Sequence, residues 1–326
     1  MTEKLVTIFG GSGFIGRYLV RRMASRSWRV RVAVRDVQEA WFLKPAGNLG
    51  QIALLPCSIT DQAAVSKAVE GADVVINLVG IMNQRGKRTF RAVHVDGAAN
   101  VAKAAAAAGV KRLIHMSALG ADPQSPSQYA VSKDAGEMAV RAAFPGVTIF
   151  RPSVVFGTED GFMNMLGMMA HVSPAIVFFT NTHPHAPQDG GSKFQPVYVG
   201  DVVEALAQAA TGEAHSGKIY ELVGPKIYDM RALAHLVNKE TGRGRMVWGL
   251  PYPVAEIAAK FLQFLPKPLL TPDQVKLLKL GSVGTGRWPG LAVFGITPTT
   301  LEVVVPTYLK RFRPVQQTKK LRLQPR

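Results

Sequence analysis

The chain has 326 residues, of which 47% are hydrophobic and 19% are charged. Its 39 Lys and Arg residues against 22 Asp and Glu residues give a net charge of +17 at pH 7. A chain of this length and apolar content can bury a large core, which excludes a disordered protein and a small disulfide scaffold. The single cysteine, Cys57, excludes an internal disulfide and any multi-cysteine metal site, and it favours a reducing compartment.

The N-terminus leads from Met1 directly into apolar, strand-like sequence, so we expect neither a signal peptide nor a transit peptide. No window of 18 apolar residues is free of charge, because even the apolar stretch 250–280 is interrupted by charged residues and prolines. We therefore expect no membrane-spanning segment. The basic surface implies an anionic partner such as a phosphorylated ligand, lipid headgroups or an acidic protein.

Short β-branched runs alternate with alanine-rich helical stretches from residue 4 to about residue 150. The predicted strands are 5–9, 29–34, 52–55, 74–78, 113–116 and 147–150. The predicted helices between them are 14–26, 61–69, 92–108 and 132–143. This alternation predicts an α/β fold with a doubly wound, Rossmann-type parallel sheet, whose ligand crevice lies at the carboxyl ends of the strands.

Beyond residue 150 glycine and proline become frequent, and helices are predicted at 201–211, 230–241 and 253–264. We predict a dinucleotide-binding domain over residues 1–150 and a smaller C-terminal α/β cap domain over residues 151–306, leaving open whether parts of the sheet are shared. A basic C-terminal tail is predicted over residues 307–326. It carries seven basic residues and no acid: Lys310, Arg311, Arg313, Lys319, Lys320, Arg322 and Arg326.

A glycine-rich loop follows the first predicted strand. Its sequence is Gly10-Gly11-Ser12-Gly13-Phe14-Ile15-Gly16. Gly10 permits a tight turn, Gly13 lets a pyrophosphate approach the backbone, and Gly16 lets the following helix pack on the sheet. Phosphates are then stabilised at the N-terminus of that helix. The loop predicts dinucleotide binding; the alternative is a purely structural glycine turn.

The residues after the second predicted strand indicate whether the protein binds NADPH or NADH. Arg35 comes first after this strand and Asp36 follows it. An arginine here accommodates a 2′-phosphate, whereas an acid binds the ribose 2′-hydroxyl. With Arg17 beside the glycine loop, Arg35 favours NADPH, and NAD is less favoured. In the alternative, Arg35 is a solvated charge and Asp36 binds the ribose.

The glycine loop, the Asn77-Leu78-Val79-Gly80 sequence and the pair Tyr129 and Lys133 resemble the extended or atypical short-chain dehydrogenase/reductase family. Longer stretches at 93–102, 113–122, 151–157 and 195–199 resemble the NADPH-binding accessory subunit of respiratory complex I, the NADH:ubiquinone oxidoreductase. The resemblance implies NADPH held without turnover beside the membrane, with other complex I subunits as partners. The absence of a transit peptide implies a bacterial version, peripheral to the cytoplasmic face of the inner membrane.

The resemblance also implies roles for individual residues. Nucleotide contacts are expected from Ser58, Ile59, Leu78, Val79, Gly80, Ser117, Tyr129, Lys133 and Pro152. In enzymes of the family the tyrosine at position 129 is the acid/base, and Lys133 lowers its pKa and holds the nicotinamide ribose. Ala118 stands where the family's second hydroxyl belongs, so Ser117 alone is left to polarise a carbonyl. No catalytic residue is firmly assigned; an active enzyme would use Tyr129, Lys133 and Ser117.

Two main hypotheses follow. The first is an accessory complex I subunit with NADPH as a structural or regulatory cofactor. The second is an NADP(H)-dependent reductase or epimerase acting on a quinone or a sugar-nucleotide-like carbonyl compound; a third keeps the fold without a nucleotide. We expect no metal site, since His183 and His185 fit an ordinary loop, and no nucleic acid. The basic tail and the stretch 251–280 are expected to contact anionic lipid or partner subunits.

Overall fold

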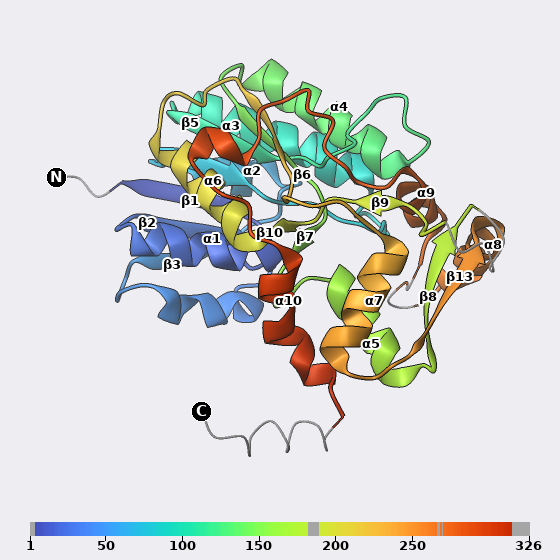
Figure 1. Ribbon diagram of the computed structural model, residues 1–326. Helices are drawn as coiled ribbons and strands as arrows, with labels where there is room; N and C mark the ends of the chain where they lie inside the picture. The colour runs from blue at the N-terminus through green and yellow to red at the C-terminus, as the bar shows by residue number, and fades with distance from the viewer. Residues whose placement is uncertain (1–3, 182–188, 266–267, 269, 315–326) are drawn as a thin grey trace, which may run out of the picture. The chain divides into compact units, whose positions relative to one another are not determined.

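The computed structural model describes residues 4–181, 189–265, 268 and 270–314 (Figure 1). Contacts within the chain group it into two compact units, each discontinuous in sequence. The first unit comprises Met1–Pro152, Val199–Leu222 and Gly284–Thr297. The second unit comprises Ser153–Tyr198, Val223–Val283 and Pro298–Arg326.

A seven-stranded sheet forms the centre of the first unit, in the order β11-β6-β5-β4-β1-β2-β3. All of its neighbouring strands are parallel. The strands are β1 (Leu5–Phe9), β2 (Arg29–Val34), β3 (Ile52–Pro56), β4 (Val74–Asn77), β5 (Arg112–Met116), β6 (Thr148–Pro152) and β11 (Ile219–Leu222). The predicted doubly wound parallel sheet is thereby confirmed. The strand order reverses between β1 and β4, which is where such sheets bind ligands.

Helices cover both faces of this sheet (Figure 1). They are α1 (Phe14–Ser25), α2 (Gln62–Val69), α3 (Gly97–Ala107), α4 (Gln128–Ala143) and α6 (Val199–Thr211). Shorter helical segments are the 3₁₀ helices η1 (Gln38–Ala46) and η3 (Leu291–Phe294) and the π-helical turn η2 (Arg91–Asp96). Apolar residues of α2, α3 and α4, such as Val65, Val101 and Val140, pack in one cluster with Val75 and Leu113 of the sheet.

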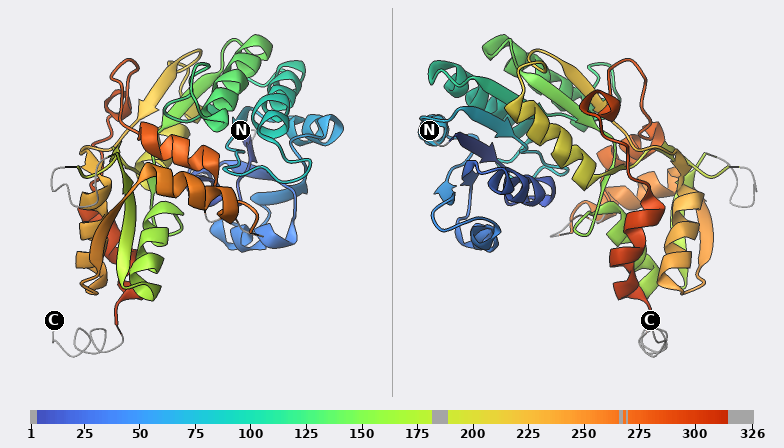
Figure 2. Two further views of the ribbon diagram at one scale, coloured as in Figure 1. Left: turned by 90° about the vertical axis from the view of Figure 1, so that its right-hand side faces the viewer. Right: turned by 60° about the vertical axis from the view of Figure 1, so that its left-hand side comes forward.

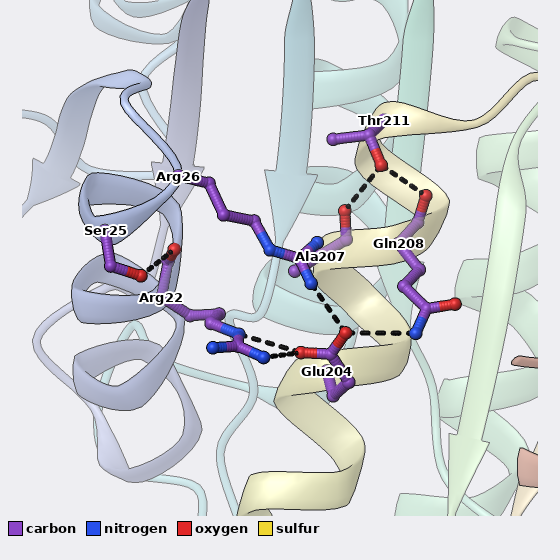
Figure 3. A network of polar contacts seen from close by, with 7 residues as sticks. All are labelled: Arg22, Ser25, Arg26, Glu204, Ala207, Gln208 and Thr211. Carbon is purple, nitrogen blue, oxygen red and sulfur yellow. Dashed lines mark hydrogen bonds and ion pairs between the residues drawn. The ribbon is translucent and has the colours of Figure 1, made fainter. Parts of the chain in front are cut away.

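An ionic network fixes α6 beside α1 (Figure 3). The carboxylate of Glu204 on α6 accepts hydrogen bonds from Arg22 on α1, from Arg26 directly after α1 and from Gln208 on α6. The bonds from Arg22 Nε and Gln208 Nε2 measure 2.7 and 3.0 Å. Burial raises the pKa of Glu204, but the bonds from Gln208 and Arg22 and the charge of Arg26 outweigh it and lower the pKa. The helix that begins at the glycine loop is thus tied to a segment about 180 residues later in the chain.

The second unit has its own core. Its helices are α5 (Phe162–Val172), α7 (Met230–Thr241), α8 (Tyr252–Leu262), α9 (Pro272–Leu280) and α10 (Leu301–Leu309). Its strands form three pairs: β7 (Val155–Phe156) with β10 (Val197–Tyr198), β9 (Lys193–Phe194) with β12 (Tyr228–Asp229), and β8 (Ala175–Thr180) with β13 (Met246–Pro251). Phe178, Leu233 and Val305 lie in one apolar cluster of this unit. The helices α8 and α9 pack against each other (Figure 2).

The start of the predicted tail belongs to this second unit. Tyr308 and Leu309 at the end of α10 are buried, as is Phe312 in the 3₁₀ turn η4 (Lys310–Phe312). The hydroxyl of Tyr308 donates a hydrogen bond of 2.7 Å to Asp160. The predicted start of the tail at residue 307 is therefore wrong, because buried apolar side chains fix the chain in the second unit as far as residue 312. The remainder, 315–326, lies outside the described residues.

Candidate nucleotide-binding site

The glycine loop follows β1 and leads directly into α1. Gly10 has a φ of +79°, and a Cβ atom on it would lie 3.2 Å from the backbone of Leu78 after β4. A Cβ atom on Gly16 would lie 2.3 Å from the carbonyl oxygen of Gly10, so the loop and helix touch without room for a side chain. Gly13 is exposed, and its Cβ position meets only the Gly10 oxygen, at 3.2 Å. The open face of the loop is therefore that of Gly13, where the uncapped N-terminus of α1 begins.

A pocket of about 320 Å³ lies beside this loop, at the carboxyl end of β2. Ser12, Arg35, Asp36 and Glu39 line it. The carboxylate of Asp36 accepts hydrogen bonds of 2.8 and 3.3 Å from the backbone N–H groups of Gln38 and Glu39, which open η1. From the sequence, Arg35 as a ligand of a 2′-phosphate and Asp36 as a ligand of the ribose were alternatives. The structure brings both residues into one pocket.

Arg17 lies on the helix side of the loop. Its Nε donates a hydrogen bond of 3.4 Å to the carbonyl of Gly13, and its guanidinium lies 4.9 Å from the ring centre of Phe42. It is not among the residues that line the pocket at Arg35. A direct contact between Arg17 and a 2′-phosphate stays a prediction.

The loops after β3 and β4 lie at the same sheet edge as the glycine loop. The Ser58 hydroxyl hydrogen-bonds to the hydroxyl of Thr60 at 2.9 Å, and Ile59 is buried. After β4, the backbone N–H of Leu78 donates to Phe9 at 3.0 Å and that of Val79 donates to the side chain of Asn77 at 3.1 Å. The loop that continues to Gly80 is thus fixed against β1.

A buried histidine, which sequence reasoning missed, connects this loop to α4. His94 in η2 accepts a hydrogen bond of 3.0 Å on Nε2 from the N–H of Ile81. Its Nδ1 must then carry the proton, which it donates to the Ser132 hydroxyl at 2.8 Å, and Ser132 donates to the carbonyl of Tyr129 at 2.7 Å. Burial, and then the charge of Lys133, lower the pKa of His94 to about 3, so the ring is neutral at physiological pH.

Tyr129 and Lys133 lie on one face of the first turns of α4. The ring of Tyr129 meets those of His94 and Phe90 edge to face, with centres 5.4 and 5.9 Å apart. Burial raises the pKa of Tyr129 to about 12, whereas the resemblance implied a pKa lowered by Lys133. The Lys133 ammonium donates instead to the carbonyl of Met116 at 2.8 Å. A phenol with this pKa is protonated at neutral pH and can act as a proton donor.

The ammonium of Lys133 is itself perturbed. Burial lowers its pKa to about 8, and the nearby carboxylate of Glu137 partly offsets this effect. Glu137 is buried, and the partly buried Arg151 donates two hydrogen bonds of 2.8 Å to its carboxylate.

Ser117 stands at the end of β5 with a buried hydroxyl that has no hydrogen-bond partner among the described residues. The Nε2 atom of His115, two residues earlier, is also buried and has no hydrogen-bond partner among the described residues. Ala118, partly buried, carries no hydroxyl. Pro152 ends the neighbouring strand β6, and its carbonyl accepts a hydrogen bond of 2.9 Å from the N–H of Leu119. A buried polar group without a partner is costly, and a bound ligand is one way to satisfy it.

These features together fit a nicotinamide dinucleotide. The glycine loop offers exposed backbone to a pyrophosphate, the pocket at Arg35 adjoins it, and the unpaired Ser117 hydroxyl lies at the end of a neighbouring part of the sheet. No group of three or more His, Cys, Asp or Glu residues in the described part of the chain could hold a metal ion. His183 and His185 lie outside the described residues.

Comparison with known proteins identifies the family. The model of the NAD dependent epimerase/dehydratase family matches residues 6–222. The chain belongs to this family. As a member, it has a fold that binds NAD or NADP, which confirms the predicted class of cofactor. The choice between the two nucleotides stays a prediction, since similar structures contain either one.

Two relatives bear on function. A subunit of mouse mitochondrial NADH dehydrogenase, "1 alpha subcomplex subunit 9", is 33% identical over 95% of this chain and 80% of its own length. A ceramide reductase of Caulobacter vibrioides is 37% identical over 55% of each chain. The predicted similarity to complex I subunits is thus confirmed.

Solved structures support the fold alone. An NADPH-dependent quinone oxidoreductase from Escherichia coli, in complex with NADPH, has a TM-score of 0.70 at 23% identity and covers 93% of this chain and 99% of its own. The UDP-glucose 4-epimerase of Thermus thermophilus, in complex with NAD, has a TM-score of 0.67 at 19% identity and covers 95% and 99%.

Proposed function

We propose that this member of the epimerase/dehydratase family is an accessory subunit of an NADH:ubiquinone oxidoreductase and holds NADPH without turnover. The similarity to the mouse subunit over 95% of the chain carries the proposal. The partners are then other subunits of that complex. In this role the nucleotide is a structural or regulatory cofactor.

The residues of the first unit have distinct tasks in holding it. The glycine loop and the start of α1 bind the pyrophosphate, and Arg35 binds the 2′-phosphate. Lys133 and Tyr129 anchor the nicotinamide ribose. When bound, NADPH supplies a hydride to a suitable acceptor. A protonated Tyr129 and a Lys133 that donates to Met116 suit anchoring, which requires no proton transfer.

Attachment beside the membrane is part of the proposal. Helix α8 buries Tyr252, Ala255 and Ala259 in its own unit. Exposed apolar side chains, which we call the α8 stripe, are those of Val254, Ile257 and Phe261 on α8 and of Phe264 in the turn that follows it; the two phenylalanines are 73% and 82% exposed.

The charge on this helix is positive. Lys260 on α8 is exposed, and the only acid on α8, Glu256, is paired with Lys279. A helix with outward aromatic residues and adjacent lysines suits the surface of an anionic membrane. No helix in the described ranges is long and apolar enough to cross a bilayer. We place this contact, with the basic residues of 315–326, at the cytoplasmic face of a bacterial inner membrane.

Copurification tests the proposal. The tagged chain, expressed at its native level, is isolated from membranes in a mild detergent, and the accompanying proteins are identified by mass spectrometry. We expect subunits of the NADH-oxidising complex in fixed stoichiometry. Isolation of the chain alone, under conditions in which that complex remains intact, would contradict the proposal.

An unpaired buried hydroxyl favours a second candidate, an NADPH-dependent reductase. Ser117 has the position and the free hydroxyl to donate a hydrogen bond to a substrate carbonyl, and Tyr129 has a proton to deliver to the same oxygen. The relative named ceramide reductase points to a ceramide as a substrate class beside quinones and sugar nucleotides.

Single-turnover mixing separates the two candidates. Protein loaded with NADPH is mixed with a quinone, with a sugar nucleotide that carries a ketone, or with a ceramide that carries a ketone. The nicotinamide absorbance is followed in each mixture. The subunit proposal expects no oxidation above the rate of a Tyr129→Phe variant. Rapid oxidation by one substrate class that Tyr129→Phe abolishes would establish the reductase.

A further inference from the structure

Helix α5 of the second unit is apolar on two faces. Three side chains of its inward face are buried in the core of this unit: Met163, Leu166 and Ala170. Three side chains of its outward face are exposed and lie in one row, which we call the α5 row: Met165, Met168 and Val172. Met168 and Val172 are 50% and 70% exposed. A helix that buries one apolar face and exposes another indicates that a further surface covers the exposed face.

Arginines from two other segments border the α5 row. Asn164 and His171 lie on one edge of the helix, because they are two turns apart. Nη2 of Arg311 donates a hydrogen bond to the side chain of Asn164. Nη2 of Arg243 donates one of 2.7 Å to Nδ1 of His171. Nε of Arg245 donates one of 2.8 Å to a carbonyl in the last turn of α5. The segments meet because α7 and α10 pack beside α5 (Figure 1).

The segments that form this surface carry positive charge and no acid. Residues 161–181, 241–255 and 310–314 contain neither Asp nor Glu. On α7, Glu240 is buried and lies 3.8 Å from Arg313. The bonds to the helix leave N–H groups of the three guanidinium groups without a partner among the described residues. These groups suit carboxylates, whose two oxygens accept paired hydrogen bonds from a guanidinium.

The composition of this surface favours a protein partner over a membrane. Surfaces buried between proteins are enriched in Met and Arg and depleted in Lys, Asp and Glu. Methionine side chains adapt to an irregular partner surface. Helix α8, by contrast, combines exposed Phe261 with exposed Lys260, a composition typical of a helix on a membrane surface. A second copy of this chain is disfavoured, since two-fold pairing of α5 with α5 would bring like arginines together.

We infer that the α5 row, with Arg243, Arg245 and Arg311, is the docking surface for an acidic protein subunit. The inference rests on the proposed function as an accessory subunit, and it names the chemistry of the partner. Apolar side chains of the partner cover the α5 row, and carboxylates around them pair with the three arginines. The α8 stripe then contacts lipid, and α5 contacts protein.

Copurification of the full-length chain with the oxidoreductase in a mild detergent tests the inference. Met168→Glu places a carboxylate in the α5 row, where it neutralises the arginines and repels the carboxylates of the partner. We expect the amount of the other subunits recovered per chain to fall about tenfold or more, the loss typical of a central interface residue. Met168→Lys keeps the positive sign and should retain several times more of these subunits than Met168→Glu. Met168 is exposed, so both variants should have the Tm of the unchanged protein.

Ile257→Glu is the matched control, because it makes the same kind of change at an exposed apolar residue of the α8 stripe in the same unit. It should keep the other subunits. Binding to vesicles of phosphatidylcholine and phosphatidylglycerol provides the second measurement. Met168→Glu should leave this binding nearly unchanged.

The outcomes separate this inference from the proposed function. If the unchanged chain copurifies with the subunits and Met168→Glu retains them equally well, the inference fails and the proposed function stands. Equal losses with Met168→Glu and Met168→Lys would contradict an acidic partner. Release from vesicles by Met168→Glu, with the subunits retained, would assign the surface to lipid instead. Loss of a dimer of the isolated chain, measured by sedimentation, would assign it to a second copy. If the unchanged chain is isolated alone, the proposed function fails and the inference fails with it.

Discussion

Two alanine substitutions in the glycine loop should separate folding from nucleotide binding. A Cβ atom on residue 16 would lie 2.3 Å from the Gly10 oxygen and 2.6 Å from the Cα of Gly11. Both atoms belong to the backbone, so the loop or the start of α1 must shift. Gly16→Ala should therefore lower the free energy of unfolding by about 1–3 kcal/mol, the usual cost of overpacking, and disturb the phosphate cradle.

Gly13→Ala is the matched control. Its Cβ atom would meet only one backbone oxygen, at 3.2 Å, which a shift of a few tenths of an ångström relieves. We therefore expect nearly normal stability. The new methyl group occupies the exposed face where a pyrophosphate would approach, so nucleotide binding should still be lost.

Thermal unfolding with and without NADPH measures both effects at once. A ligand at one hundred times its Kd stabilises the folded state by about 2.7 kcal/mol. For a unit of this size that corresponds to a rise in Tm of about 5–10 °C. The unchanged protein should show the full rise, Gly13→Ala should have a normal Tm without the rise, and Gly16→Ala should have neither. A Gly13→Ala protein that NADPH stabilises as well as the unchanged one would refute this account of the loop.

Four further expectations follow from individual contacts. Arg35→Asp should weaken NADPH about 10- to 100-fold and reverse the preference for NADPH over NADH, and equal affinity of the unchanged protein for both nucleotides would remove the argument. Ser117→Ala removes a hydroxyl without a described partner, so chemical denaturation should change by no more than about 0.5 kcal/mol, whereas any NADPH oxidation should slow about 100-fold. The pKa of Lys133 is about 8 in the folded protein, against an ordinary value of 10.5, so the unfolded state binds more protons than the folded state between these two pH values. The free energy of unfolding should therefore rise with pH from about 8 to about 10.5, and Lys133→Met should flatten that rise. Deletion of residues 315–326 should preserve the Tm and release the protein from anionic vesicles at lower salt, whereas deletion from 307 removes the buried Tyr308, Leu309 and Phe312 and should unfold the second unit.

Local sequence was sufficient to predict the elements that surround the site. Strand β1 and strand β2 begin and end at the predicted residues, because short runs of β-branched residues are a local signal. The glycine loop and Arg35 were found for the same reason. Their place relative to β1 follows from the parallel order alone.

Long-range pairing set the limit of sequence reasoning. Strand β11 was missed because its four residues pair with β6 about 70 positions earlier, and no local pattern marks that contact. The turn η2 was predicted as part of one helix with α3, because η2 runs directly into α3 and no local sequence pattern marks a single π-helical turn. His94 within it has a hydrogen-bonding role that depends on Ile81 and Ser132, which come from other elements.

The protonation of Tyr129 shows a further limit. Spacing of four residues placed it on the same helix face as Lys133, but the pKa depends on how deeply the phenol is buried and where the ammonium points. Such properties follow from packing across strands, which a single sequence does not display.

The most direct test of the central claim measures the nucleotide during turnover of the purified assembly. The oxidoreductase is isolated with this chain bound and is allowed to oxidise NADH with a quinone for many cycles. Samples are taken before and after these cycles, and the nucleotides bound in each sample are released and quantified. We expect one NADPH per chain, unchanged in amount and oxidation state while NADH is consumed. Absence of bound NADPH, or its oxidation in step with turnover, would contradict the account.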